Sequence, residues 1–159
     1  MPIALFRVDE RLIHGQMVIG WGTSLRPERY IVVDRTLSES SWEQELYVLG
    51  LPDGASALFL SPSGAREELD SWRESETVSV LLTRNIEAML ELARGGLLQD
   101  EEVNLGGLHF RGGREEILPY LFLDAQERVL LEKLQKEGAE VSARDLPGSP
   151  KVPLDKLLS

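Results

Sequence analysis

The chain has 159 residues, a net charge of −10 at neutral pH, 42% hydrophobic residues and no cysteine. This size and composition fit one globular domain, which we assign to residues 1–159. Such an acidic chain disfavours nucleic acid and anionic membranes as direct partners, because both carry negative charge. The lack of cysteine excludes disulfides and thiolate chemistry. Without a signal-like start or a long apolar run, the sequence predicts a cytoplasmic protein that is not inserted in a membrane.

The pattern of apolar residues predicts strands and helices in alternation. Strands are predicted where short apolar runs lie between turn residues: 3–6, 30–33, 57–60, 78–82, 103–105, 120–123 and 139–143. Helices are predicted in the segments between them and at the end: 15–24, 39–49, 61–72, 85–94, 124–137 and 151–158. This order indicates an α/β protein, with an open, twisted, mostly parallel sheet of six or seven strands and helices on both faces.

Two of the predicted helices carry specific expectations about burial. The helix over 39–49 is expected to bury Trp42, Leu46 and Leu49. The helix after Asp124 is expected to have an apolar face made of three residues, Val129, Leu130 and Leu134. Trp21 is expected on the buried side of the first helix.

Charge is unevenly distributed along the chain. Residues 1–34 contain four arginines and four acidic residues, whereas residues 37–76 contain nine acidic residues and two arginines. Either the acidity is kept away from an anion-binding site near the N-terminus, or the acidic residues form the solvated faces of surface helices.

The loop after the first predicted strand carries the densest set of chemically active groups. Residues 7–16 read Arg-Val-Asp-Glu-Arg-Leu-Ile-His-Gly-Gln. A loop between a strand and a helix binds anions well, because free N–H groups and the positive end of the helix dipole point outward. An imidazole with a pKa near neutrality can attack a phosphoryl group. We therefore predict that His14 holds or covalently carries a phosphate, rather than serving as a structural histidine.

Neighbouring residues have predicted supporting roles. Arg11 can bind phosphoryl oxygens with its forked donors, or form a surface salt bridge with Glu10. Asp9 can fix the His14 tautomer, orient Arg11 or cap a helix. Further residues are predicted to bind phosphate or support the site: Arg7, Gly15, Gln16, Gly106, Gly107 and Arg111.

A second loop contains four glycines within residues 106–113. It follows a predicted parallel strand, so it is expected to meet the His14 loop at the carboxyl edge of the sheet. It is not a Walker phosphate loop, because no Gly-Lys-Ser/Thr follows. His109 is better explained as structural, and contact of His109 or Arg111 with phosphate stays open. No cluster of ligand residues indicates a metal, and no cofactor is expected.

Residues 7–16 resemble the R-[IV]-D-[DE]-R-L-[IL]-H-G-Q signature of the IIB component of the mannose/fructose/sorbose family of the bacterial phosphotransferase system (PTS). Residues 103–113 are similar to the family's N-[VL]-G-G-M-x-F-x-x-G segment, with Leu108 in place of methionine. The acid-rich middle of the chain matches the family only in pattern.

This resemblance implies a phosphotransferase in which His14 is phosphorylated on Nδ1. The donor would be the phosphorylated IIA component, and the acceptor a sugar taken up through the IIC and IID membrane components. The alternative is a regulatory or interaction module of the same fold without sugar transport of its own. The sugar, and the choice between monomer and homodimer, stay open.

Overall fold

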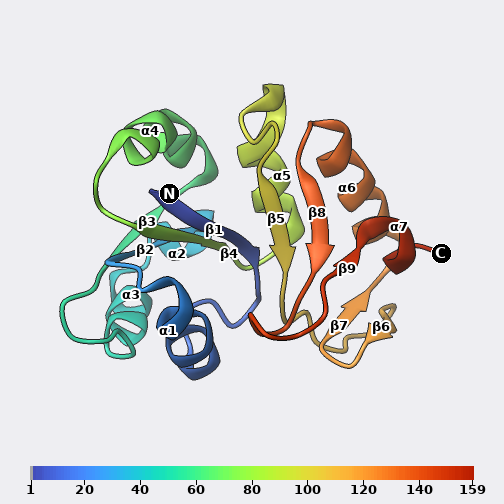
Figure 1. Ribbon diagram of the computed structural model, residues 1–159, viewed down its shortest axis with the longest axis horizontal. Helices are drawn as coiled ribbons and strands as arrows, with labels where there is room; N and C mark the ends of the chain where they lie inside the picture. Colours follow the sequence, from blue (N-terminus) through green and yellow to red (C-terminus); the bar gives the residue numbers. More distant parts are fainter. Residues whose placement is uncertain (1) are drawn as a thin grey trace.

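The computed structural model describes residues 2–159 and contains a seven-stranded sheet in the order β3-β2-β4-β1-β5-β8-β9 (Figure 1). All neighbouring strands are parallel except the short β9, which is antiparallel to β8. The predicted mostly parallel α/β sheet is therefore confirmed. The strands are β1 (Ile3–Val8), β2 (Arg29–Val33), β3 (Ser56–Leu60), β4 (Ser79–Thr83), β5 (Glu102–Leu105), β8 (Glu140–Ala143) and β9 (Val152–Pro153).

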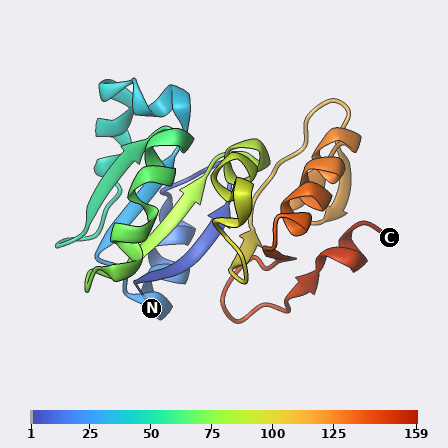
Figure 2. The same ribbon diagram turned by 90° about the horizontal axis from the view of Figure 1, so that it is seen from above.

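Helices pack on both faces of the sheet (Figures 1 and 2). The two edge strands of the sheet, β3 and β9, lie on opposite sides of the molecule. One face is covered by η1 (Gln16–Trp21, a π-helix), α1 (Gly22–Leu25), α2 (Arg35–Ser38) and α3 (Ser41–Val48). The other face is covered by α4 (Pro62–Glu74), α5 (Ile86–Ala93) and α6 (Ala125–Lys136). The 3₁₀ turn η2 (Arg94–Gly96) follows α5, and α7 (Leu154–Leu157) lies near the C-terminus. No helix within residues 2–159 is long and apolar enough to cross a membrane.

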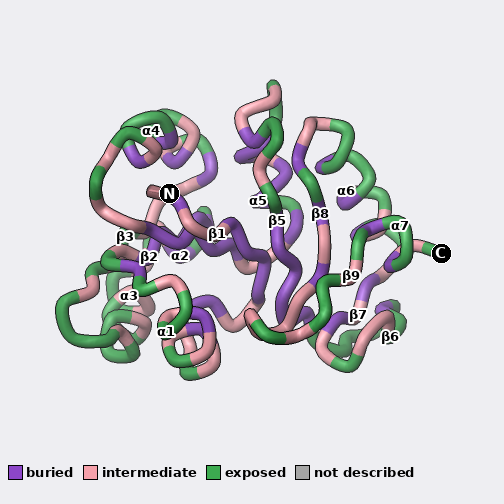
Figure 3. The backbone as a smooth tube through the Cα atoms, in the orientation of Figure 1, coloured by how far each residue is buried: buried purple, intermediate pink, exposed green. Residues whose placement is uncertain are grey.

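The central strands supply two hydrophobic cores, one on each face (Figure 3). In β2, Ile31 and Val33 point into the core under α4 and α5. Tyr30 and Val32 point into the other core, beneath η1 and α2. Because both faces are covered, the strand has no alternation of polar and apolar residues, which is the pattern that predicted it.

The predicted burial of the helix over 39–49 is wrong. The chain forms α3 there, and Trp42, Leu46 and Leu49 are 65%, 58% and 82% exposed. The inner side of α3 is instead made by Gln44, which donates to a backbone carbonyl, and by Tyr47. The apolar residues do share one face of the helix, but that face lines an open groove beside β3 and is largely exposed to solvent.

Two predictions near the C-terminal half also need correction. The run at 120–123 does not join the main sheet: β7 (Leu121–Leu123) pairs with β6 (Glu115–Leu118) in a separate antiparallel hairpin. The sequence did not reveal β6, because it begins with two glutamates. In α6, Val129 was expected in the apolar face but is 48% exposed. Leu131, which was not expected there, is buried in the core instead.

Candidate functional site

The His14 loop (residues 9–15) leaves β1 at the point where the helices change from one face of the sheet to the other. The glycine loop (residues 106–113) leaves the neighbouring strand β5 at the same edge. The backbone N–H of Glu10 donates to the carbonyl of Gly107 over 2.9 Å, and Gly106 donates to Val8 over 2.7 Å. The two loops therefore meet, as predicted, where ligands bind in open α/β sheets.

Asp9 is fully buried and holds Arg11 in a fixed orientation. Arg11 donates from Nε to one carboxylate oxygen over 3.1 Å and from Nη2 to the other over 3.0 Å, and its backbone N–H adds a third bond of 3.0 Å. Burial disfavours the charge on Asp9, but the bond from Arg11 and the charge of Arg7 outweigh it, so the pKa of Asp9 lies below its ordinary value. Asp9 therefore stays anionic and orients Arg11.

The other two roles considered for Asp9 do not match the geometry. Its carboxylate makes no bond to His14, whose ring contacts a backbone carbonyl instead. The residue at the N-cap of η1 is Gly15, so Asp9 does not cap that helix.

Arg7 lies behind Asp9, inside the protein, with only 1% of its surface exposed. Its Nη2 donates to Asp9 over 3.1 Å, and its Nη1 donates to the side chain of Asn104 and to the carbonyl of Arg144. The guanidinium also stacks 5.1 Å from the ring centre of Trp21. Arg7 therefore supports the loop from beneath and does not face a phosphate outside it.

Gly106 and Gly107 are needed because two arginines pass directly over them. A Cβ on Gly106 would overlap the Arg7 guanidinium, and a Cβ on Gly107 would lie 2.9 Å from Arg11 Nη2. Neither glycine has a positive φ, so close approach rather than backbone freedom explains both. By contrast, a Cβ on Gly15 would meet open space.

The His14 ring is half-buried, and its Nδ1 lies 2.8 Å from the carbonyl oxygen of Leu12. A carbonyl oxygen only accepts hydrogen bonds, so Nδ1 carries the proton in this arrangement and Nε2 does not. Nε2 is buried and has no hydrogen-bond partner among residues 2–159. Burial lowers the pKa of His14, although the Leu12 carbonyl opposes the shift. The ring is therefore neutral near pH 7, as a nucleophile must be.

Leu12 gives the loop its shape at a cost in backbone strain. It has a φ of 55°, unusual for a branched side chain, and it is completely buried in the core beneath the loop. Such a conformation costs on the order of 1–3 kcal/mol and persists only where the surroundings enforce it. Here it directs the Leu12 carbonyl at His14.

A second ionic cluster, which no sequence pattern indicated, joins the two loops. Arg114 is buried and binds Glu127 through two parallel bonds of 2.9 and 2.7 Å. It also approaches Glu10 at 3.4 Å, and Glu10 in turn contacts His109 Nδ1 at 2.7 Å. Glu10 is thus part of this cluster, and His109 has a structural place. Arg111 is 66% exposed and lies 4.0 Å from Glu127.

Gln16 begins η1 and lies beside the C-terminal part of the chain. Its side-chain amide is 3.5 Å from the Asp145 carboxylate, a marginal contact. Gln16 is therefore near the loop, and its side chain contacts Asp145 rather than His14.

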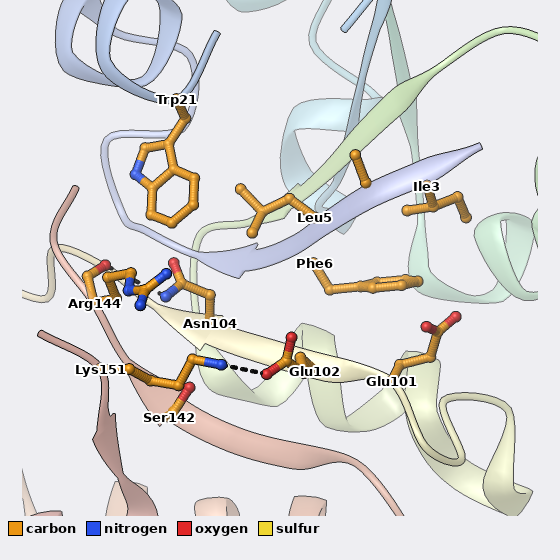
Figure 4. A pocket seen from close by; sticks show the side chains of 11 residues that line it. Ile3, Leu5, Phe6, Trp21, Glu101, Glu102, Asn104, Ser142, Arg144 and Lys151 are labelled. Atoms are coloured by element: carbon orange, nitrogen blue, oxygen red, sulfur yellow. Dashed lines mark hydrogen bonds and ion pairs between the residues drawn. The ribbon is translucent and has the colours of Figure 1, made fainter. Parts of the chain in front are cut away.

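A cavity of about 190 Å³ opens beside this network, on the face of β1, β5 and β8 (Figure 4). Trp21, Asn104 and Arg144 line one end of it, and the Lys151–Glu102 ion pair crosses it. Neither His14 nor Arg11 lines it. The candidate acceptor therefore lies on the loop, outside this cavity.

Comparison with known proteins agrees with this geometry. Residues 3–159 match the model of the PTS system sorbose subfamily IIB component. An N-acetylgalactosamine-specific phosphotransferase enzyme IIB component 2 from Escherichia coli (strain K12) is 29% identical, over 99% of this chain and 100% of its own. A sorbose-specific EIIB component from Lacticaseibacillus casei is 28% identical, over 94% of this chain and 91% of its own. These relatives have similar identity but are named for different sugars.

A solved structure gives the same result for the fold. The IIBSor domain of the sorbose permease from Klebsiella pneumoniae superimposes with a TM-score of 0.87 and 26% identity. The match covers 99% of this chain and 96% of that one.

Proposed function

The chain belongs to the sorbose subfamily of phosphotransferase-system IIB components, and from this premise we propose that His14 is the residue that carries the phosphoryl group. Proteins of this family are phosphotransferases of sugar phosphorylation. The observation that carries the proposal is the neutral, half-buried imidazole beside a guanidinium that a buried carboxylate holds in place.

In the proposed reaction, phosphorylated IIA donates the phosphoryl group. A bond forms between phosphorus and His14 Nδ1 while the bond from phosphorus to the IIA histidine breaks. For this attack, the proton on Nδ1 moves to Nε2 and the ring leaves the Leu12 carbonyl. With phosphorus on Nδ1 and this proton on Nε2, the phosphorylated ring is a cationic imidazolium, and it becomes neutral when Nε2 releases the proton to solvent.

Arg11 is the group best placed to stabilise that charge. Its Nε and Nη2 are bonded to Asp9, so Nη1 is left to contact the phosphoryl oxygens. The side chain is 31% exposed, enough to meet a group that arrives from solution. A donor oriented before the reaction stabilises charge without reorganisation during it.

The second transfer passes the group from His14 to a sugar held by the IIC and IID membrane components. We assign the choice of sugar to those components, because neither His14 nor Arg11 lines the cavity beside the loop. A regulatory module of the same fold would accept phosphate but would not complete this second step.

The test is phosphorylation in vitro, followed by intact mass. The chain contains two histidines, so His109→Ala is a matched control for His14→Ala. With phosphoenolpyruvate, the general PTS proteins and IIA, the wild type and His109→Ala should gain one acid-labile phosphate, and His14→Ala should gain none. A phosphate retained by a folded His14→Ala protein would refute the assignment.

A further inference from the structure

Exposed apolar side chains gather on one part of the surface, around α3 and the edge strand β3. Of the eight large apolar residues most exposed within residues 2–159, four lie on or at the end of α3: Trp42, Leu46, Val48 and Leu49. A groove of about 810 Å³ runs between α3 and β3, with Phe59 in its wall. We call this region the α3 surface. Apolar patches of this kind on a protein surface mark interaction sites.

The α3 surface is also acidic. Residues 36–65 contain four acidic residues, namely Glu39, Glu43, Glu45 and Asp53, and no lysine or arginine. None of the four carboxylates forms an ion pair with a residue in the described part of the chain. A partner that covers this surface must therefore supply apolar side chains together with positive charge.

The α3 surface adjoins the His14 loop. At the end of α3, a Cβ on Gly50 would lie 3.9 Å from the side chain of Ile13, the residue directly before His14. Tyr47 packs against the same buried cluster as Leu12 and Ile13. A protein docked on α3 would therefore lie next to the phosphorylated imidazole.

We propose that the α3 surface docks the cytoplasmic face of the membrane component that receives the phosphoryl group. The proposal rests on the proposed function above. Cytoplasmic loops of membrane proteins carry an excess of lysine and arginine, which complements the four unpaired carboxylates. Leu46, Leu49 and Trp42 supply the apolar anchors that an interface needs at its centre.

The other side of the His14 loop has a different character. In the glycine loop, Phe110 is 70% exposed and the side chain of Arg111 is 66% exposed. An exposed arginine beside an exposed phenylalanine suits IIA, which arrives carrying a negative phosphoryl group. The two partners would thus approach His14 in turn from different sides.

The experiment compares two transfers in the double variant Leu46→Ser/Leu49→Ser and in a control, Val129→Ser. Val129 is 48% exposed on α6, outside the α3 surface. Phosphorylation by phospho-IIA is followed by intact mass. Transfer to sugar is followed in inverted membrane vesicles that contain the IIC and IID proteins of the same system.

We expect the double variant to be phosphorylated by IIA at the wild-type rate, and its transfer to sugar at limiting concentration to fall by about tenfold or more, as for loss of a central contact. Val129→Ser should match the wild type in both assays. The rate of transfer to sugar by the wild type should also fall as the salt concentration rises. In the variant Glu43→Gln/Glu45→Gln, this rate should depend less on salt than in the wild type.

Each other result overturns the proposal. Loss of phosphorylation by IIA would assign the surface to IIA, and unchanged transfer in both assays would leave it without a partner. A wild-type dimer that the double variant converts to a monomer would make the surface an interface between two copies. Failure of the wild type itself to accept phosphate would refute the proposed function, and this proposal with it.

Discussion

Replacement of Asp9 by asparagine tests whether the buried carboxylate holds the site together. The change keeps the shape of the side chain but removes the negative charge between Arg7, which is 1% exposed, and Arg11, which is 31% exposed. Removing one partner of a buried ion pair costs about 3–5 kcal/mol, because the other charge is left buried and uncompensated. For a domain of this size, that loss corresponds to a fall in the melting temperature of about 10 °C.

The assay is thermal and urea unfolding of Asp9→Asn against Glu102→Gln. Glu102 forms an exposed pair with Lys151, so its isosteric replacement should cost less than about 0.5 kcal/mol. The same variant should transfer phosphate slowly, because Arg11 loses the two bonds that orient it.

The stability difference between wild type and Asp9→Asn should depend on pH in one direction. The pKa of Asp9 is lowered in the folded protein, so its charge stabilises the fold at every pH above the ordinary carboxyl range. As the pH falls, this stabilisation begins to be lost near the ordinary carboxyl pKa of about 4. It is fully lost once the pH is below the lowered pKa of Asp9 in the folded protein. If Asp9→Asn unfolds with the same free energy as Glu102→Gln at neutral pH, the reasoning about the buried network is refuted.

Three further predictions follow from the same loops. Arg11→Ala should slow phosphoryl acceptance by about a hundredfold, and Arg11→Lys should recover only part of it; a lysine variant at the wild-type rate would argue against the forked contact. Gly107→Ala should slow acceptance by about tenfold or more through displacement of Arg11, whereas Gly148→Ala, with open space around it, should not; equal rates would exclude that displacement. His14 should titrate by NMR below pH 6.5, and phosphorylation should increase amide exchange in the His14 loop as the ring leaves Leu12; unchanged exchange would indicate a rigid loop.

The sequence by itself determined the fold class and the position of the candidate acceptor. Apolar runs without alternation, as at 30–33, are typical of strands that are covered on both faces, so together with the helices between them they indicate a buried parallel sheet. The dense polar loop after the first strand identified His14, Arg11 and Asp9 because neighbouring residues in a chain necessarily stay close in space.

Only the tertiary structure decided what the charged residues contact. Arg7 binds Asn104 and Arg144, and Arg114 binds Glu10, across more than 90 positions of sequence. These pairs arise because parallel strands bring their carboxyl ends together, and no local pattern encodes which side chains then meet.

The α3 helix illustrates the same limit for apolar residues. Spacing of three and four positions correctly places Trp42, Leu46 and Leu49 on one face of a helix. Whether that face meets the sheet or the solvent depends on how the helix is rotated at the sheet edge, where Gln44 and Tyr47 turn inward. Periodicity determines which residues lie together, and packing alone determines what they lie against.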